Sequence, residues 1–333
     1  MKKFPFLLLI ICGLVPQLYA DIRQSRLKDG TKAVIFGDIA RQYAMNKLDY
    51  GSRVEFKNVR HKIAFVTPKR EFFYNNIRIV PGYAPEKQQV RSSVFTRWMR
   101  KNARNDIAVS RSDWNSTLRP LMNPSSVAKH RVYTITLDAG HGGNDTGALG
   151  KYSREKNITL RIARRTATLL RACNYKVVFT RSTDKTLSLD ARRSIQKKQK
   201  SDLFVSIHVN AVKQRSINGI ETFALTPADA PSTGGKKELI YHPSNVRDSN
   251  NFLLAYHLQK ALLSRTGAVD RGVKRARFAV LRDISAPGAL VEVGFITNAQ
   301  EEKLLNSAAY IEKISRAIAE GIISYHRTVL YSK

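Results

Sequence analysis

The sequence predicts an α/β fold, with a largely parallel sheet flanked by helices and a small α+β domain before it. Residues 132–328 alternate short apolar runs with longer helical patterns, which is typical of a parallel sheet with crossover helices. Residues 21–122 instead carry short alternating runs. The chain has 333 residues and is 43% hydrophobic. This length and composition suit about two domains with buried cores.

The first segment is expected to form a small accessory domain over residues 21–122. Apolar and polar residues alternate in it, so we expect strands at 52–59, 62–66 and 76–80. Helices are expected at 38–48, capped by Asp38, and at 110–120, ending near Pro120. The arrangement resembles the stalk-like domain at the N-terminus of copper amine oxidases. Residues 123–131 are mostly polar and are interpreted as a linker.

The second segment, 132–328, supplies the elements of the α/β domain. Apolar runs predict six strands, and apolar residues at helical spacing predict three long helices. The strands are expected at 132–137, 177–179, 203–207, 220–225, 278–281 and 289–293, and the helices at 158–172, 248–264 and 308–325.

The first twenty residues have the pattern of a secretory signal peptide. Met1-Lys2-Lys3 is basic, residues 4–15 are apolar, and Ala20 provides a small residue for cleavage. The apolar run is shorter than the roughly 20 residues needed to span a bilayer. We therefore expect an exported protein that works in the periplasm or, as the alternative, is secreted beyond the cell.

The net charge of +31 comes from 57 Lys and Arg against 26 Asp and Glu. The excess is spread over both segments, with +13 in residues 21–130 and +16 in residues 131–333. Such a charge favours polyanionic partners. Because the signal peptide predicts export, we expect anionic envelope surfaces and no nucleic acid.

Four polar side chains fall at or near the ends of the predicted strands and helices of the second segment. His141 follows the first strand within a glycine-rich turn, and Glu155 stands where the next helix begins. His208 ends a buried strand, and Glu292 lies among apolar residues of another. In parallel sheets the ligand site lies beyond the carboxyl ends of the strands. The four side chains are therefore candidates for one site.

Two imidazoles and a carboxylate suit a zinc ion that keeps a position open for water. Glu292 would be a natural general base for that water. Each residue also has an ordinary structural interpretation. His141 would be a hydrogen-bonding loop residue, His208 a core imidazole, and Glu155 a first-turn carboxylate favoured by the helix dipole. Glu292 is the least ordinary, because a Glu inside a buried strand is costly unless it is paired.

Five motifs follow one another along residues 132–327: Leu137–Ala148, Glu155-Lys156, Thr180–Asp184 with Leu189–Arg192, Ser201–Ala211 and Pro287–Asn298. Together they resemble the zinc-dependent N-acetylmuramoyl-L-alanine amidases of the type-3 family. The resemblance implies hydrolysis of the amide between N-acetylmuramic acid and L-alanine of the peptidoglycan stem peptide. By position, His141, Glu155 and His208 match the zinc ligands, and Glu292 matches the catalytic glutamate.

The same resemblance raises the question of a partner. Family members in cell division often carry a helix that plugs the site until an activating protein withdraws it. Residues 226–247 contain Pro and Gly and lack a long amphipathic pattern, so we expect a loop there. Activation by a partner at the division site stays open.

Two other functions remain as alternatives. One is a peptidase that cuts within the stem peptide, either with zinc or with a serine. Ser153 and Lys156, and likewise Ser194 and Lys197, have the Ser-x-x-Lys spacing of penicillin-binding proteins. The other is a non-catalytic wall-binding protein that keeps the fold without the metal.

Overall fold

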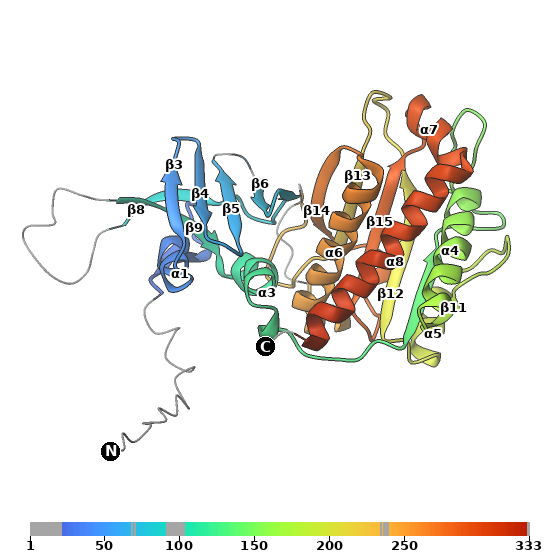
Figure 1. The fold of residues 1–333 in the computed structure, drawn as a ribbon, viewed down its shortest axis with the longest axis horizontal. Helices are drawn as coiled ribbons and strands as arrows, with labels where there is room; N and C mark the ends of the chain where they lie inside the picture. Colours follow the sequence, from blue (N-terminus) through green and yellow to red (C-terminus); the bar gives the residue numbers. More distant parts are fainter. Residues whose placement is uncertain are drawn as a thin grey trace, which may run out of the picture.

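The computed structural model describes residues 22–67, 69, 71–90, 104–233, 235 and 240–331, so the predicted signal peptide at 1–20 lies outside the described residues. The N-terminal segment lies beside one edge of the larger α/β part (Figure 1). None of the described helices is long and apolar enough to cross a membrane.

The N-terminal segment is built mostly from short antiparallel strands. Its elements are β1 (Gln24–Arg26), β2 (Lys32–Ile35), α1 (Phe36–Gln42), β3 (Asn46–Asp49), β4 (Arg53–Lys57), β5 (Lys62–Val66), β6 (Glu71–Tyr74), β7 (Ile77–Ile79), β8 (Glu86–Val90), β9 (Arg104–Ser110), α2 (Arg111–Asp113), a π-helical turn η2 (Trp114–Leu118), α3 (Arg119–Met122) and a 3-10 turn η3 (Pro124–Ser126).

The second segment alternates strands with helices, as predicted. Its elements are β10 (Thr134–Ala139), α4 (Glu155–Ala172), β11 (Lys176–Phe179), α5 (Leu189–Lys198), β12 (Leu203–Asn210), β13 (Ile220–Leu225), η4 (Pro243–Arg247), α6 (Asp248–Thr266), β14 (Asp270–Ala276), η5 (Ala279–Leu281), β15 (Gly288–Phe295), α7 (Ala299–Asn306) and α8 (Ala308–Tyr331).

The sheet of the second segment has the order β11-β10-β12-β15-β13-β14. Neighbours pair in parallel except β13 and β15, which are antiparallel. The largely parallel sheet flanked by helices is therefore confirmed.

This sheet continues into the N-terminal segment. β14 pairs in parallel with β7, where Val273 is the partner of Ile79 and the Val80 N–H donates to the Val273 carbonyl at 2.9 Å. Strands β6, β5, β4 and β3 follow, which gives an 11-stranded sheet among the described residues. The proposed division into domains at 21–122 and 132–328, with a linker at 123–131, stays a prediction. The two segments share one sheet.

Alternate residues of the central strands face opposite sides of the sheet. One side, with Leu137, Val205 and Val291, packs against α4, α6 and α8 in the main hydrophobic core. The other side, with Phe204, Phe223 and Leu290, forms a smaller core with η5. His208, Glu221 and Glu292 share the strand parity of this second side, which leaves them on the side away from the three long helices.

Two predicted elements were wrong in part. The strand expected at 278–281 is not formed: Ala279–Leu281 form a 3-10 turn, and the strand lies just before it, at β14. Its Arg271, Lys274 and Arg275 obscured the apolar pattern, and they are tolerated because Glu221 and buried backbone oxygens pair with them. The predicted helix at 38–48 ends at Gln42, and β3 follows.

Local contacts explain the other differences in helix boundaries. Ala44, with a φ of 49°, adopts the left-handed conformation after α1. Asp38 does not cap that helix but accepts hydrogen bonds from Arg23 at 2.9 Å and 2.7 Å. The helix expected to end near Pro120 continues to Met122. Helices α5 and α7 were not predicted, although Ser188 and Asn298 cap them with side-chain oxygens. In the range 226–247, where a loop is expected, the described residues up to 242 contain no helix, and Pro243–Arg247 form the 3-10 turn η4.

Candidate active site

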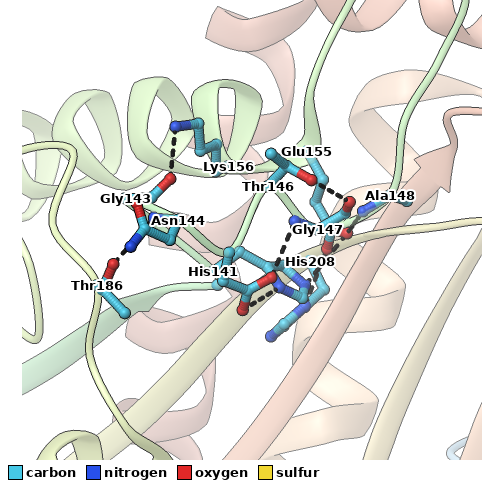
Figure 2. Close-up of polar contacts among 12 residues, drawn as sticks. His141, Gly143, Asn144, Thr146, Gly147, Ala148, Glu155, Lys156, Thr186 and His208 are labelled. Atoms are coloured by element: carbon cyan, nitrogen blue, oxygen red, sulfur yellow. Dashed lines mark hydrogen bonds and ion pairs between the residues drawn. The ribbon is translucent and has the colours of Figure 1, made fainter.

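Three of the four predicted side chains meet where β10, α4 and β12 come together. β10 ends at Ala139 and leads into the loop that carries His141, α4 begins at Glu155, and His208 lies near the end of β12. One ligand atom from each of these three side chains lies within 4.8 Å of the other two. Figure 2 shows both imidazole rings directed toward the Glu155 carboxylate.

Glu155 is the central member of this group, with a side chain that is only 5% exposed. Its Oε2 lies 3.2 Å from His141 Nε2, and its Oε1 lies 2.9 Å from His208 Nδ1. The carboxylate also accepts backbone N–H bonds from Ala148 at 2.8 Å and Val209 at 2.9 Å. Burial opposes ionisation of Glu155, but the bonds from His141 and His208 outweigh it and hold its pKa far below the usual value.

The loop orients His141 through its second ring nitrogen. Asp145 Oδ2 lies 2.8 Å from His141 Nδ1, which leaves Nε2 to face Glu155. Gly147, with a φ of 63°, passes so close that a Cβ there would lie 2.6 Å from both Glu155 Oε2 and the His141 ring. The glycine therefore makes room for the Glu155 carboxylate and the His141 ring. The sequence prediction missed Asp145, although a carboxylate four residues after a candidate ligand is a recognisable signal.

Glu292 lies beside this group on the neighbouring strand. It is the register partner of His208 in the parallel pairing of β15 with β12. Its Oε2 is buried and has no hydrogen-bond partner among the described residues. Burial raises the pKa of Glu292 well above its usual value, with repulsion from Glu155 and Glu221 adding to the effect and Lys274 opposing it. The carboxyl is therefore suited to hold a proton.

Glu221 is a second buried carboxylate that the sequence prediction missed. It is the register partner of Glu292 across the antiparallel pairing of β13 with β15. It accepts a hydrogen bond from Asn210 Nδ2 at 2.9 Å and forms ion pairs with Lys274 and Arg271. Glu221 carries the same sequence signal as Glu292, because it too is a Glu within an apolar strand.

The donor set fits a metal ion by its chemistry. Two imidazoles and one carboxylate, with His141 oriented by a further carboxylate, are the ligands and support that catalytic zinc sites use. The side chains of His141 and His208 are 25% and 19% exposed, so a small molecule can approach. The site can hold a cation next to a carboxyl that exchanges protons.

The serine arrangement considered as an alternative does not form at Ser153. The Ser153 hydroxyl donates to Glu302 Oε1 at 2.6 Å. The Lys156 ammonium group instead donates to the Gly143 carbonyl at 2.8 Å and to Asp184 Oδ2 at 2.7 Å. Serine and lysine therefore have different partners.

Comparison with known proteins places most of the second segment in one family. The model of one family, described as N-acetylmuramoyl-L-alanine amidase, matches residues 135–324, more than half of the chain. The chain belongs to this amidase family. The match contains all four predicted site residues and every strand from β10 to β15 except the first residue of β10.

Curated relatives carry the same name. The chain is 36% identical over 228 residues to N-acetylmuramoyl-L-alanine amidase AmiC of Escherichia coli O6:H1, which covers 61% of this chain and 55% of that protein. It is 38% identical over 194 residues to N-acetylmuramoyl-L-alanine amidase LytC of Bacillus subtilis, which covers 58% of this chain and 36% of that protein. The match thus spans about half of the first relative and about a third of the second.

A solved amidase structure is also similar. The CwlD amidase from Clostridioides difficile, solved in complex with the GerS lipoprotein, aligns with a TM-score of 0.50 and 32% identity. The alignment covers 58% of this chain and 98% of that chain. The second segment of the present protein therefore has the fold of an amidase catalytic domain.

Proposed function

We propose that this protein hydrolyses the amide between N-acetylmuramic acid and L-alanine of the peptidoglycan stem peptide. Membership of the amidase family supports the reaction class. The main support is the pairing of His208 with Glu292 on neighbouring strands. It places a carboxyl that can exchange protons one strand away from the group formed by His141, Glu155 and His208.

We propose zinc as the resident ion, held by His141, Glu155 and His208. When bound, zinc makes a water acidic enough to attack at neutral pH and polarises the scissile carbonyl. Asp145 fixes the ring of His141 so that Nε2 is available as a ligand.

Glu292 is proposed as the general base and acid. Its Oε2 has no competing hydrogen bond among the described residues, so it is available to accept the proton of the attacking water. The same burial that raises its pKa lets it retain that proton and then pass it to the leaving alanine nitrogen. The Glu292 carboxyl thus accepts a proton from the attacking water and then donates it to the leaving nitrogen.

The setting of this reaction is the cell envelope. The signal peptide pattern at 1–20 supports export to the periplasm, with secretion as the alternative, and the net charge of +31 supports attraction to anionic envelope surfaces. We further propose a role in cell division, with an activating protein as a partner. The complex of the related CwlD amidase with a lipoprotein supports a search for such a partner.

Mass spectrometry of purified sacculi digested by the mature protein tests the reaction. Free stem peptides with an L-alanine N-terminus are expected, and a chelator should abolish them until zinc is restored. Cuts within the stem peptide would instead establish the peptidase alternative. Binding to sacculi without any released product, with zinc present, would establish the wall-binding alternative.

A further inference from the structure

Two buried arginines hold the backbone of the loop that presents His141. Arg181 Nε donates to the Ala139 carbonyl at 2.9 Å, and its Nη2 donates to the Gly140 carbonyl at 2.8 Å. Arg192 Nη1 donates to the Ala139 carbonyl at 2.8 Å, and its Nη2 donates to the His141 carbonyl at 2.7 Å. Three successive carbonyls therefore point at two guanidinium groups.

The His141 backbone needs such support. Its φ of 61° lies in the left-handed region, which is sterically unfavourable for a residue that carries a Cβ atom. A conformation of this kind persists only where surrounding contacts fix it. The bond from Arg192 to the His141 carbonyl is such a contact, because it holds the peptide unit that follows the strained residue.

The same arginines are also linked to the segments that carry Glu155 and His208. Arg181 Nη2 also donates to the carbonyl of Lys156, the neighbour of Glu155, at 2.8 Å. Arg192 Nη1 pairs with Asp138 Oδ1 at 2.7 Å. Asp138 Oδ2 in turn accepts from the hydroxyl of Ser206, two residues before His208 on β12, at 2.7 Å. The loop and the first turn of α4 are thereby joined through Arg181, and the loop and β12 through Arg192, Asp138 and Ser206.

Burial of these charged side chains is not explained by the stability of the fold alone. Arg181 and Arg192 are 3% and 4% exposed, and Asp138 is the one buried carboxylate with which either forms an ion pair among the described residues. Burying a charge carries a desolvation penalty, and apolar side chains of similar size often stabilise a fold as well or better. The directional bonds to the carbonyls therefore suggest a role in placing the backbone.

We propose that Arg181 and Arg192 are positioning residues that set the relative placement of His141, Glu155 and His208, and with it the affinity and geometry of metal binding. This inference rests on the proposed function of these three side chains as metal ligands. Among the described residues, neither guanidinium group hydrogen-bonds the side chains of His141, Glu155 or His208. The two arginines act through the backbone of the His141 loop and of α4, and through Asp138.

Substitution by lysine tests the proposal because lysine keeps the charge but cannot bond two carbonyls in fork geometry. Arg181→Lys and Arg192→Lys should weaken zinc binding about 10–100-fold in competition with a chromogenic chelator. With cobalt in place of zinc, the visible absorption bands should shift, which reports ligand geometry without any assay of activity. Arg193→Lys is the matched control, since this neighbouring arginine bonds the Ala279 carbonyl and exposed Asp190. It should bind both metals like the wild type.

Ser206→Ala provides a milder second variant should either lysine variant fail to fold, because it removes only the bond between Asp138 and β12. It should also weaken zinc binding, by less than the arginine variants do. Wild-type affinity and an unchanged cobalt spectrum in the folded arginine variants, or in Ser206→Ala where those do not fold, would overturn the positioning role. A wild-type protein that binds no zinc would instead overturn the proposed metal site and this inference with it.

Discussion

Glu292 lies directly opposite His208 across the parallel pairing of β15 with β12, and directly opposite Glu221 across the antiparallel pairing with β13. Register partners point to the same face, and neighbouring strands lie about 4.8 Å apart. The proposed base is thereby fixed one strand from a proposed metal ligand, on rigid elements of the fold. This placement leads to the first prediction.

Glu292→Gln should abolish most hydrolysis while metal binding persists. The amide is nearly the same size as the carboxyl but cannot accept and return a proton, and loss of general acid–base catalysis typically costs about 10²–10⁴-fold in rate. Release of labelled fragments from sacculi measures the rate, and metal analysis measures zinc. Glu320→Gln, at an exposed pair with Arg265, is the control. Turnover of Glu292→Gln within a few-fold of wild type would exclude Glu292 as the base.

Asp145→Ala should weaken zinc binding about 10–100-fold, because the Nδ1 of His141 loses the carboxylate that orients the ring. Asp145 is largely exposed, so the free energy of unfolding in the presence of a chelator should change little. Chelator competition measures the affinity, and Asp190→Ala, at an exposed carboxylate on α5, is the control. Equal zinc affinity in wild type and Asp145→Ala would show that His141 does not depend on Asp145.

Gly140→Ala should displace the His208 ring, although the imidazole itself is unchanged. A Cβ at this position would lie 2.5 Å from His208 Cε1 and 2.7 Å from Nε2, so the ring or the loop must move. We expect a loss of about 1–3 kcal/mol in the free energy of unfolding, together with weaker zinc binding. Urea denaturation and chelator competition measure the two effects. At Gly235 the nearest atom to an added Cβ is Ser232 Cβ at 3.3 Å, so Gly235→Ala should leave zinc binding unchanged.

The sequence predicted the parallel sheet and the four candidate site residues because apolar runs and polar residues at strand ends are local signals. It could not predict that Arg271, Lys274 and Arg275 belong to a buried strand, since their partners lie far away in the chain. The pairing of β7 with β14, which joins the two segments in one sheet, could not be predicted for a related reason. Strand pairing between residues almost 200 positions apart leaves no pattern in either segment.

His257 should make stability fall in acid. Burial lowers the pKa of His257 from 6.5 to about 3, with Lys260 adding to the effect. The unfolded chain therefore binds a proton that the folded chain rejects, so this contribution is intact above about pH 6.5 and is lost as pH falls toward 3. Between pH 7 and pH 5 the loss amounts to about 2 kcal/mol.

Urea denaturation of wild type and His257→Gln at both pH values, with a chelator present, measures this contribution. Both proteins share the other titrating groups, so the wild type should lose about 2 kcal/mol more than the variant between pH 7 and pH 5. Gln can still bond Ser324, the partner of His257 Nδ1 at 2.9 Å. Parallel losses in the two proteins would mean that His257 titrates normally in the folded state.

The shared sheet predicts that the two segments unfold together. Both tryptophans, Trp98 and Trp114, lie in the N-terminal segment, whereas the long helices α4, α6 and α8 lie in the second. Tryptophan fluorescence and far-ultraviolet circular dichroism therefore report mainly on different segments. In urea the two signals should change at the same midpoint, as expected for one cooperative unit. Separate midpoints would show that the segments are independent domains.

Arg275 is a buried side chain that bonds across the boundary between the two segments. The residue is 2% exposed, and its Cζ lies 4.5 Å from the centre of the Phe252 ring. Its Nη2 donates across the boundary to the Ser116 carbonyl at 2.8 Å and to Thr117 Oγ1 at 3.0 Å. Arg275→Met leaves these oxygens unpaired and removes the charge that faces three aspartates, so we expect a loss of about 3–5 kcal/mol. If Arg275 couples the unfolding of the two segments, tryptophan fluorescence of this variant should change at a lower urea concentration than circular dichroism. Arg265→Met, at an exposed ion pair, should keep a single transition.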